Sequence, residues 1–219
     1  MIDARVYLVT GDTAGRPLAD VVAAAVAGGV TLVQLREKGA TRDELAATYV
    51  QLHDALAGTG VPIVVNDDAD AVAEVGADGI HVGPDDITPK AARRRLGTDA
   101  VIGWSIHDLA QLHETDQVRA SDYLAASPVW PTPTKPNTTD PLGLDGVAVL
   151  RRAMPPQLPL VAIGGIDASN AGDVIAAGAD GVAIVSAICA AHDPERAAHE
   201  LRSAVDDAID HRGVRPKGA

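Results

Sequence analysis

Charged, amide and hydroxyl side chains in this sequence follow directly after short apolar runs. Arg36 and Lys38 follow one run, Asn66 and Asp67 follow the next, and Ser105 ends a later one. Cationic side chains bind phosphate oxygens, and carboxylates beside an amide suit Mg2+. These residue types indicate a site for a phosphorylated small molecule and a divalent cation.

A glycine turn between two late apolar runs indicates a second phosphate site. Gly164 and Gly165 follow the first run, a helix comes next, and the second run ends near Ser186. We expect Asp167 or Ser169 to cap that helix. Free backbone N–H groups at such turns bind anions, and this layout is typical of the end of a (β/α)8 barrel.

The elements that must position these residues alternate between strand and helix, at a spacing of roughly 25 residues that favours a parallel sheet. The expected strands cover residues 6–10, 30–34, 62–65, 79–82, 101–103, 123–126, 160–163 and 182–185. We therefore predict the α/β class and a single-domain (β/α)8 TIM barrel over residues 1–211, with 212–219 as a disordered tail. An open doubly wound sheet is the alternative.

Composition excludes several classes of partner. A formal net charge of −12 argues against nucleic acid and against an anionic membrane surface. Hydrophobic residues make up 47% of the chain and there is no Phe, so the core must be largely aliphatic. The single cysteine, Cys189, fits a reducing cytoplasm and is expected to be buried and inert. We expect a cytoplasmic protein with phosphorylated small-molecule substrates, no nucleic acid and no membrane; a homodimer is one possible assembly.

The charged residues also have structural interpretations. Residues 36–38 could be a solvated charge run. Asp67, Asp68 or Asp70 could cap the following helix, and Asp86 could cap a helix near residue 88. Carboxylates at two adjacent strand ends nevertheless favour a Mg2+ site that holds a diphosphate.

Two further features carry open alternatives. His81 lies within a strand and is either a hydrogen-bonded barrel histidine or a base. The proline-rich loop Pro128–Leu142 is either a plain connection or a functional lid. Its Thr132, Thr134 and Lys135 would suit phosphate binding.

Several motifs occur together in a characteristic order. They are QLREK at 34–38, ND at 66–67, HVG at 81–83 with Asp86 downstream, Ser105, PTPTK at 131–135, IGGI at 163–166 and VSAI at 185–188. Over Tyr7 to Ile188 the chain resembles the thiamine-phosphate synthase family. The resemblance implies a Mg2+-dependent transferase that joins hydroxymethylpyrimidine diphosphate to hydroxyethylthiazole phosphate, forming thiamine phosphate and releasing diphosphate.

The resemblance also implies a role for each matching residue. The pyrimidine diphosphate would contact Gln34, Leu35, Arg36, Glu37, Lys38, Asn66, Ser105 and Lys135, of which Arg36, Lys38, Ser105 and Lys135 would be catalytic. The thiazole phosphate would contact Thr132, Pro133, Thr134, Gly165, Val185 and Ser186. The Mg2+ ligands would be Asp67 and Asp86.

The sequence departs from the family pattern at Asp68, Pro84 and residues 125–127. Because of these departures, the resemblance does not fix the shape of the pocket. Two alternative functions remain: a thiazole tautomerase-like isomerase on the same barrel, and a non-catalytic phosphate-binding barrel.

Overall fold

Eight parallel strands form a closed barrel, each paired with its neighbours in sequence and β8 paired with β1. This computed structural model describes residues 2–131 and 140–213. The closed order confirms the predicted barrel over an open sheet. The strands are β1 (Val6–Val9), β2 (Leu32–Leu35), β3 (Ile63–Asn66), β4 (Gly79–Val82), β5 (Val101–Ile106), β6 (Tyr123–Ala126), β7 (Leu160–Ile163) and β8 (Gly181–Ile184).

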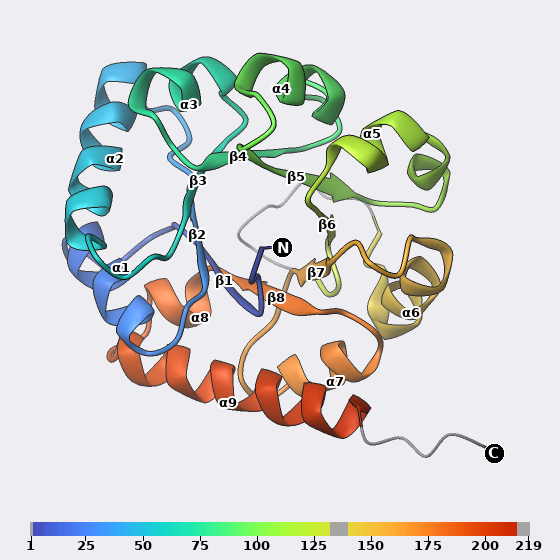
Figure 1. Ribbon diagram of the computed structural model, residues 1–219. Helices are drawn as coiled ribbons and strands as arrows, with labels where there is room; N and C mark the ends of the chain where they lie inside the picture. Colours follow the sequence, from blue (N-terminus) through green and yellow to red (C-terminus); the bar gives the residue numbers. More distant parts are fainter. Residues whose placement is uncertain (1, 132–139, 214–219) are drawn as a thin grey trace.

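Helices surround the barrel in a ring (Figure 1). They are α1 (Leu18–Ala27), α2 (Arg42–Ala55), α3 (Ala69–Val75), α4 (Pro89–Leu96), the 3-10 turn η1 (Ala110–His113), α5 (Thr115–Ala120), α6 (Gly143–Ala153), α7 (Ala171–Ala176), α8 (Ser186–Cys189) and α9 (Pro194–Gly213). In Figure 1, α9 runs along the lower edge of the barrel beside α7, α8 and α1. No described helix is long and apolar enough to span a bilayer.

Side chains along each strand alternate between the barrel interior and the layer under the helices. In β2, Leu32 belongs to the interior cluster, whereas Val33 and Leu35 belong to the outer core. Gln34 therefore faces inward, where its amide contacts the Tyr7 hydroxyl. This alternation decides which residue of each strand end reaches the site.

The helix starts follow local capping chemistry. Thr41 and Glu44 form a capping box at the start of α2. The expected cap of α7 is wrong: its N-cap is Asn170, with no side-chain cap bond. The carboxylate of Asp167 instead accepts hydrogen bonds from the Ser169 N–H and hydroxyl in a local Asx turn.

A backbone clamp occurs four times at the N-terminal end of the barrel. The residue before each even-numbered strand accepts a hydrogen bond through its side chain from an N–H at the start of the preceding strand. The backbone N–H of the residue before the even-numbered strand also donates to the backbone carbonyl of that residue in the preceding strand. These floor clamps join Thr31 to Val6 (3.2 Å), Asp78 to Ile63 (2.7 Å), Asp122 to Ile102 (2.7 Å) and Asp180 to Leu160 (3.0 Å).

Arginines attach the helices to this floor. Arg93 donates to Asp122 at 2.6 Å, and both Arg151 and Arg212 donate to Asp180 at 3.0 Å. Arg212 and Gly213 are helical, so α9 continues through the first two residues of the predicted tail; residues 214–219 lie outside the described part of the chain.

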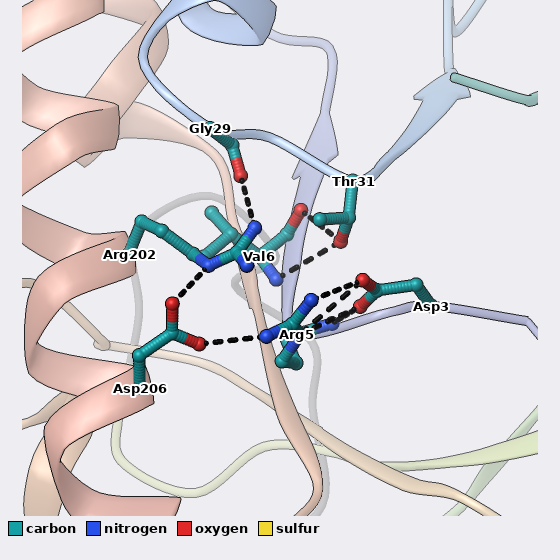
Figure 2. A network of polar contacts seen from close by, with 7 residues as sticks. All are labelled: Asp3, Arg5, Val6, Gly29, Thr31, Arg202 and Asp206. Atoms are coloured by element: carbon teal, nitrogen blue, oxygen red, sulfur yellow. Dashed lines mark hydrogen bonds and ion pairs between the residues drawn. The ribbon is translucent and has the colours of Figure 1, made fainter. Parts of the chain in front are cut away.

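Figure 2 shows the corresponding contacts around the clamp at Thr31. Arg202 on α9 donates to the carbonyl of Gly29 and to Asp206. Asp206 in turn pairs with Arg5 at 3.0 Å. The last helix is thereby tied to the start of the first strand.

Candidate active site

A cavity of about 760 Å3 opens at the C-terminal ends of the strands. This is the end at which barrel enzymes place their chemistry. Ten of the predicted site residues line it: Gln34, Arg36, Lys38, Asn66, Asp67, Asp86, Ser105, Gly165, Val185 and Ser186. Residues from six different strand ends therefore converge on one space.

Two predicted residues have side chains that lie away from the cavity. Leu35 is fully buried in the outer core, because it alternates with the inward Gln34. The carboxylate of Glu37 accepts a hydrogen bond from the Thr48 hydroxyl on α2 at 3.0 Å. Thr132, Pro133, Thr134 and Lys135 lie outside the described residues.

The backbone of Arg36 in the loop after β2 is held by the Thr10 side chain. The Arg36 N–H donates to the Thr10 hydroxyl oxygen at 2.8 Å, and that hydroxyl donates to the Arg36 carbonyl at 3.2 Å. Within the described residues, no carboxylate forms an ion pair with Arg36 or Lys38. Both cations line the cavity and could bind an anionic ligand.

Asp67 and Asp86 form a carboxylate pair across the cavity mouth. Partial loss of hydration, followed by hydrogen bonding with Asp86 and repulsion from its charge, raises the pKa of Asp67 to about 6. Hydrogen bonding by Asn66 and the charge of Arg36 act in the opposite direction. Two carboxylates that repel each other need a shared proton or a cation.

Neither of these two carboxylates caps a helix, because other residues cap α3 and α4. Asp68 caps α3 by accepting from the N–H groups of Asp70 and Ala71, and Thr88 caps α4. Asp86 instead accepts from the Gly83 N–H at 2.7 Å. Asp67 has a φ of +65°, a left-handed conformation that is costly for a non-glycine residue. Such outliers cluster at functional sites.

No group of three or more His, Cys, Asp or Glu side chains in residues 2–131 and 140–213 is arranged to hold a metal ion. Mg2+ commonly binds through one or two carboxylates together with substrate phosphates. The donor set of Asp67, Asp86 and Asn66 therefore fits Mg2+ when a phosphate completes the coordination.

The glycine turn after β7 lies on another side of the cavity. Gly164 and Gly165 have φ values of +112° and +68°, which glycine adopts without strain. A Cβ at Gly164 would lie 2.8 Å from the Cβ of Pro128, so the backbone approach also requires glycine. Val185 and Ser186 follow β8 next to this turn. Backbone N–H groups at a turn of this kind are suited to bind an anion.

A chain of hydrogen bonds crosses the barrel interior below the cavity. The Gln34 amide contacts the Tyr7 hydroxyl, which lies 2.8 Å from the Tyr123 hydroxyl. His81 Nδ1 lies 2.9 Å from Tyr123 Oη, and its Nε2 lies 2.9 Å from Ser105 Oγ. We call these five residues the interior chain. His81 is therefore hydrogen-bonded within the barrel, as one of its two interpretations predicts.

Sequence reasoning missed Tyr7 and Tyr123 as parts of the site. Both occupy inward positions on their strands, so the alternation of side chains was the available signal. His107, which also lines the cavity, was missed as well; its Nδ1 lies 2.7 Å from the Ser127 carbonyl. The sequence predicted that β5 ends at residue 103, whereas the strand continues to Ile106. His107 therefore did not stand at the expected strand end.

Comparison with known proteins agrees with this geometry. The family model described as thiamine monophosphate synthase matches residues 6–188. The chain belongs to the thiamine-phosphate synthase family. A thiamine-phosphate synthase from Albidiferax ferrireducens is 48% identical over 204 residues, which are 92% of each chain. One from Natronomonas pharaonis is 45% identical and covers 93% of this chain and 96% of its own.

A solved structure supports the same family. The thiamine phosphate pyrophosphorylase from Pyrococcus furiosus superposes with a TM-score of 0.83 at 31% identity, covering 94% of this chain and 98% of its own. Members of the thiamine-phosphate synthase family are transferases that release diphosphate. The match over nearly the full length assigns this chain to that class of enzyme.

Proposed function

We propose that this barrel joins hydroxymethylpyrimidine diphosphate to hydroxyethylthiazole phosphate by a dissociative substitution. The observation that carries the proposal is the separation of charge in the cavity. Cations and a carboxylate pair lie at the ends of β2 to β4, whereas a neutral glycine turn lies at the ends of β7 and β8. One region suits a diphosphate with Mg2+, and the other suits a single phosphate.

Arg36, Lys38, Asn66 and Ser105 would hold the diphosphate, with Gln34 against the pyrimidine. Arg36 and Lys38 have no competing ion pair among the described carboxylates. Their charges are therefore available to the leaving group. Lys135 is proposed for the same role, on the resemblance of the PTPTK motif.

Asp67 and Asp86 would bind Mg2+, which supplies positive charge to the departing diphosphate. The raised pKa of Asp67 supports this role, because a bound cation would relieve the repulsion between the two carboxylates. Gly165, Val185 and Ser186 would bind the thiazole phosphate through backbone N–H groups and a hydroxyl. Thr132, Pro133 and Thr134 are proposed to contact it from the loop.

In the proposed reaction, the bond between the pyrimidine methylene carbon and the diphosphate oxygen breaks first. The electron pair leaves with the diphosphate. The thiazole nitrogen then donates its lone pair to the methylene carbon, forming the new C–N bond. The site needs preorganised positive charge and a nearby nucleophile rather than a strong base. A cytoplasmic location, as expected for a chain with one buried thiol, belongs to the same proposal.

The test is an assay with both substrates, with and without Mg2+, that follows diphosphate and thiamine phosphate together. We expect equal amounts of both products, only when Mg2+ is present. Thiazole phosphate binding without turnover would instead favour the non-catalytic barrel. Isomerisation of a thiazole without diphosphate release would favour the tautomerase.

A further inference from the structure

The interior chain connects two residues that are proposed to contact the same substrate. Gln34 lies at one end and Ser105 at the other, and both line the cavity. The three residues between them, Tyr7, Tyr123 and His81, are at most 8% exposed. Because unpaired polar groups are costly in so buried a place, each hydrogen bond of the chain constrains the next. The donor or acceptor role of Gln34 is therefore coupled to that of Ser105.

The fold makes specific room for this chain. Tyr123 enters the interior at the start of β6, opposite Gly103 on β5. A Cβ at Gly103 would lie 2.1 Å from Tyr123 Cζ and 2.2 Å from its hydroxyl oxygen. The Tyr123 ring packs edge-on against Tyr7 and nearly parallel to His81, with ring centres 5.7 Å apart in both cases. The rings are thus fixed by packing as well as by hydrogen bonds.

Both tyrosines remain neutral. Burial raises the pKa of Tyr7 and of Tyr123 well above the ordinary value for a phenol. Each hydroxyl therefore carries one hydrogen and can donate one hydrogen bond. In the described structure the Tyr7 hydroxyl has two partners, the Gln34 amide and the Tyr123 hydroxyl.

This count fixes the direction of the whole chain. Because the Gln34 amide N–H donates to the Tyr7 oxygen, the Tyr7 hydrogen must go to the Tyr123 oxygen. The Tyr123 hydrogen is then donated to His81 Nδ1. A neutral imidazole whose Nδ1 accepts carries its hydrogen on Nε2, which donates to Ser105 Oγ. The Ser105 hydroxyl hydrogen is left for the cavity.

The reverse direction would give the two ends opposite properties. A Gln34 that accepted from Tyr7 through Oε1 would turn each bond around, and the Ser105 hydrogen would be donated to His81. Ser105 would then present only lone pairs to the cavity, which repel phosphate oxygens. Only the first direction leaves Gln34 Oε1 as an acceptor and Ser105 as a donor to an anion.

We propose that Tyr7, Tyr123 and His81 are positioning residues that make Gln34 a hydrogen-bond acceptor and Ser105 a hydrogen-bond donor toward the pyrimidine diphosphate. The ligand that matches these ends has an N–H donor at the ring and anionic oxygens on the leaving group. The substrate assignment rests on the proposed function. The direction of the chain rests on the orientation of the Gln34 amide, whose Nε2 faces the Tyr7 hydroxyl, and on the single hydrogen of each tyrosine.

The first test needs no turnover. The 15N NMR signals of the imidazole in the ligand-free protein, assigned by their loss in His81→Asn, report which nitrogen carries hydrogen. We expect the Nε2–H form of His81 in the wild type, and a mixture of both forms in Tyr123→Phe. An Nδ1–H form in the wild type would overturn the proposal, whatever the enzyme's activity.

The second test is kinetic. Tyr123→Phe should lower kcat about tenfold and leave the KM for the thiazole phosphate unchanged, because one oriented donor to an anion is lost. In a Ser105→Ala background the same substitution should have little further effect. If Tyr123→Phe lowered kcat by the same factor in the Ser105→Ala background as in the wild type, Tyr123 would act independently of Ser105. That result would overturn the proposal.

Matched variants separate this role from a loss of folding. Tyr49→Phe removes another phenol hydroxyl, one that lies 3.5 Å from the Gly76 carbonyl outside the barrel, and should leave kcat unchanged. If Tyr123→Phe folds poorly, Tyr7→Phe replaces it. That variant should raise the KM for the pyrimidine diphosphate and give a mixture of both His81 forms, because Tyr123 no longer receives the Tyr7 hydrogen; an unchanged KM would count against the proposal.

Discussion

Aspartates serve both ends of the barrel, but their partners differ. At the floor, Asp122 accepts from the Ile102 N–H and from Arg93, so its charge is matched by protein donors. At the mouth, Asp67 faces Asp86, and the nearby Arg36 forms no ion pair with any described carboxylate. The floor is complete within the protein, whereas the mouth has charges that a ligand would match in the proposed function.

This contrast predicts that mouth and floor substitutions affect different quantities. At the floor, breaking a clamp removes protein–protein bonds and should reduce stability. At the mouth, removing a group should reduce turnover while leaving the fold intact. The variants below run from the largest expected effect to the smallest.

Arg36→Ala should lower turnover by about 100- to 1,000-fold, because a preorganised charge at the leaving group is lost. The melting temperature should stay close to that of the wild type. Diphosphate release and thermal unfolding measure the two quantities. Arg42→Ala removes an arginine that pairs instead with Asp68 at 3.3 Å, and serves as the matched control with unchanged turnover. Equal losses in both variants would break the contrast.

Asp122→Ala should lower the free energy of unfolding by about 2 kcal/mol, since a charged acceptor of the Ile102 N–H and of Arg93 disappears. Urea unfolding gives this value, and turnover at low temperature should remain unchanged. Asp99→Ala changes an exposed aspartate whose side chain bonds only with Thr98 among the described residues, and should cost almost nothing. A loss of turnover in folded Asp122→Ala would contradict the separation of the two ends.

Thr31→Ala breaks the one floor clamp that uses a neutral hydroxyl. The bond from the Val6 N–H to Thr31 is also longer than the aspartate clamps, at 3.2 Å. We therefore expect a smaller loss, about 1 kcal/mol in urea unfolding. A loss equal to or larger than that of Asp122→Ala would show that charge does not strengthen the clamps.

Asp67→Asn tests the incomplete charge balance of the mouth. The native pKa of Asp67, about 6, lies above the ordinary value for an aspartate. The native state therefore binds this proton more tightly than the unfolded state, and wild-type stability falls as pH rises through 6. Without Mg2+ the variant should be the more stable protein above pH 7, by up to about 1 kcal/mol after allowance for solvent screening.

The difference should shrink as pH falls from 7 to 4, because wild-type Asp67 then becomes neutral like asparagine. Urea unfolding across this range measures it. Added Mg2+ should stabilise the wild type and not the variant. A difference that is constant with pH would rule out a raised pKa at Asp67.

Much of the fold could be predicted from the sequence because its signals are local. Short aliphatic runs, glycine-terminated helices and the Gly164–Gly165 turn each follow from backbone preferences. The convergence of Arg36, Asp67 and Ser105 followed as well, because a parallel barrel brings all carboxyl ends of strands to one end.

The parts that escaped prediction depend on three-dimensional packing. Leu35 and Glu37 belong to a site motif, yet one points outward by alternation and the other bonds to Thr48 on α2. Tyr7 and Tyr123 lie 116 positions apart in the sequence, and only closure of the barrel brings their hydroxyls together. Aromatic residues in apolar strands give no local sign of such a contact.

The floor clamps also divide the barrel into four modules. Each clamp joins an odd-numbered strand to the even-numbered strand that follows it, so β1–β2, β3–β4, β5–β6 and β7–β8 are closed pairs. Opening the chain between β2 and β3, or between β4 and β5, would leave every clamp within one continuous segment. Opening it within a pair would leave one clamp to form between two separated segments. Circular permutants with new termini between the pairs should therefore refold more readily.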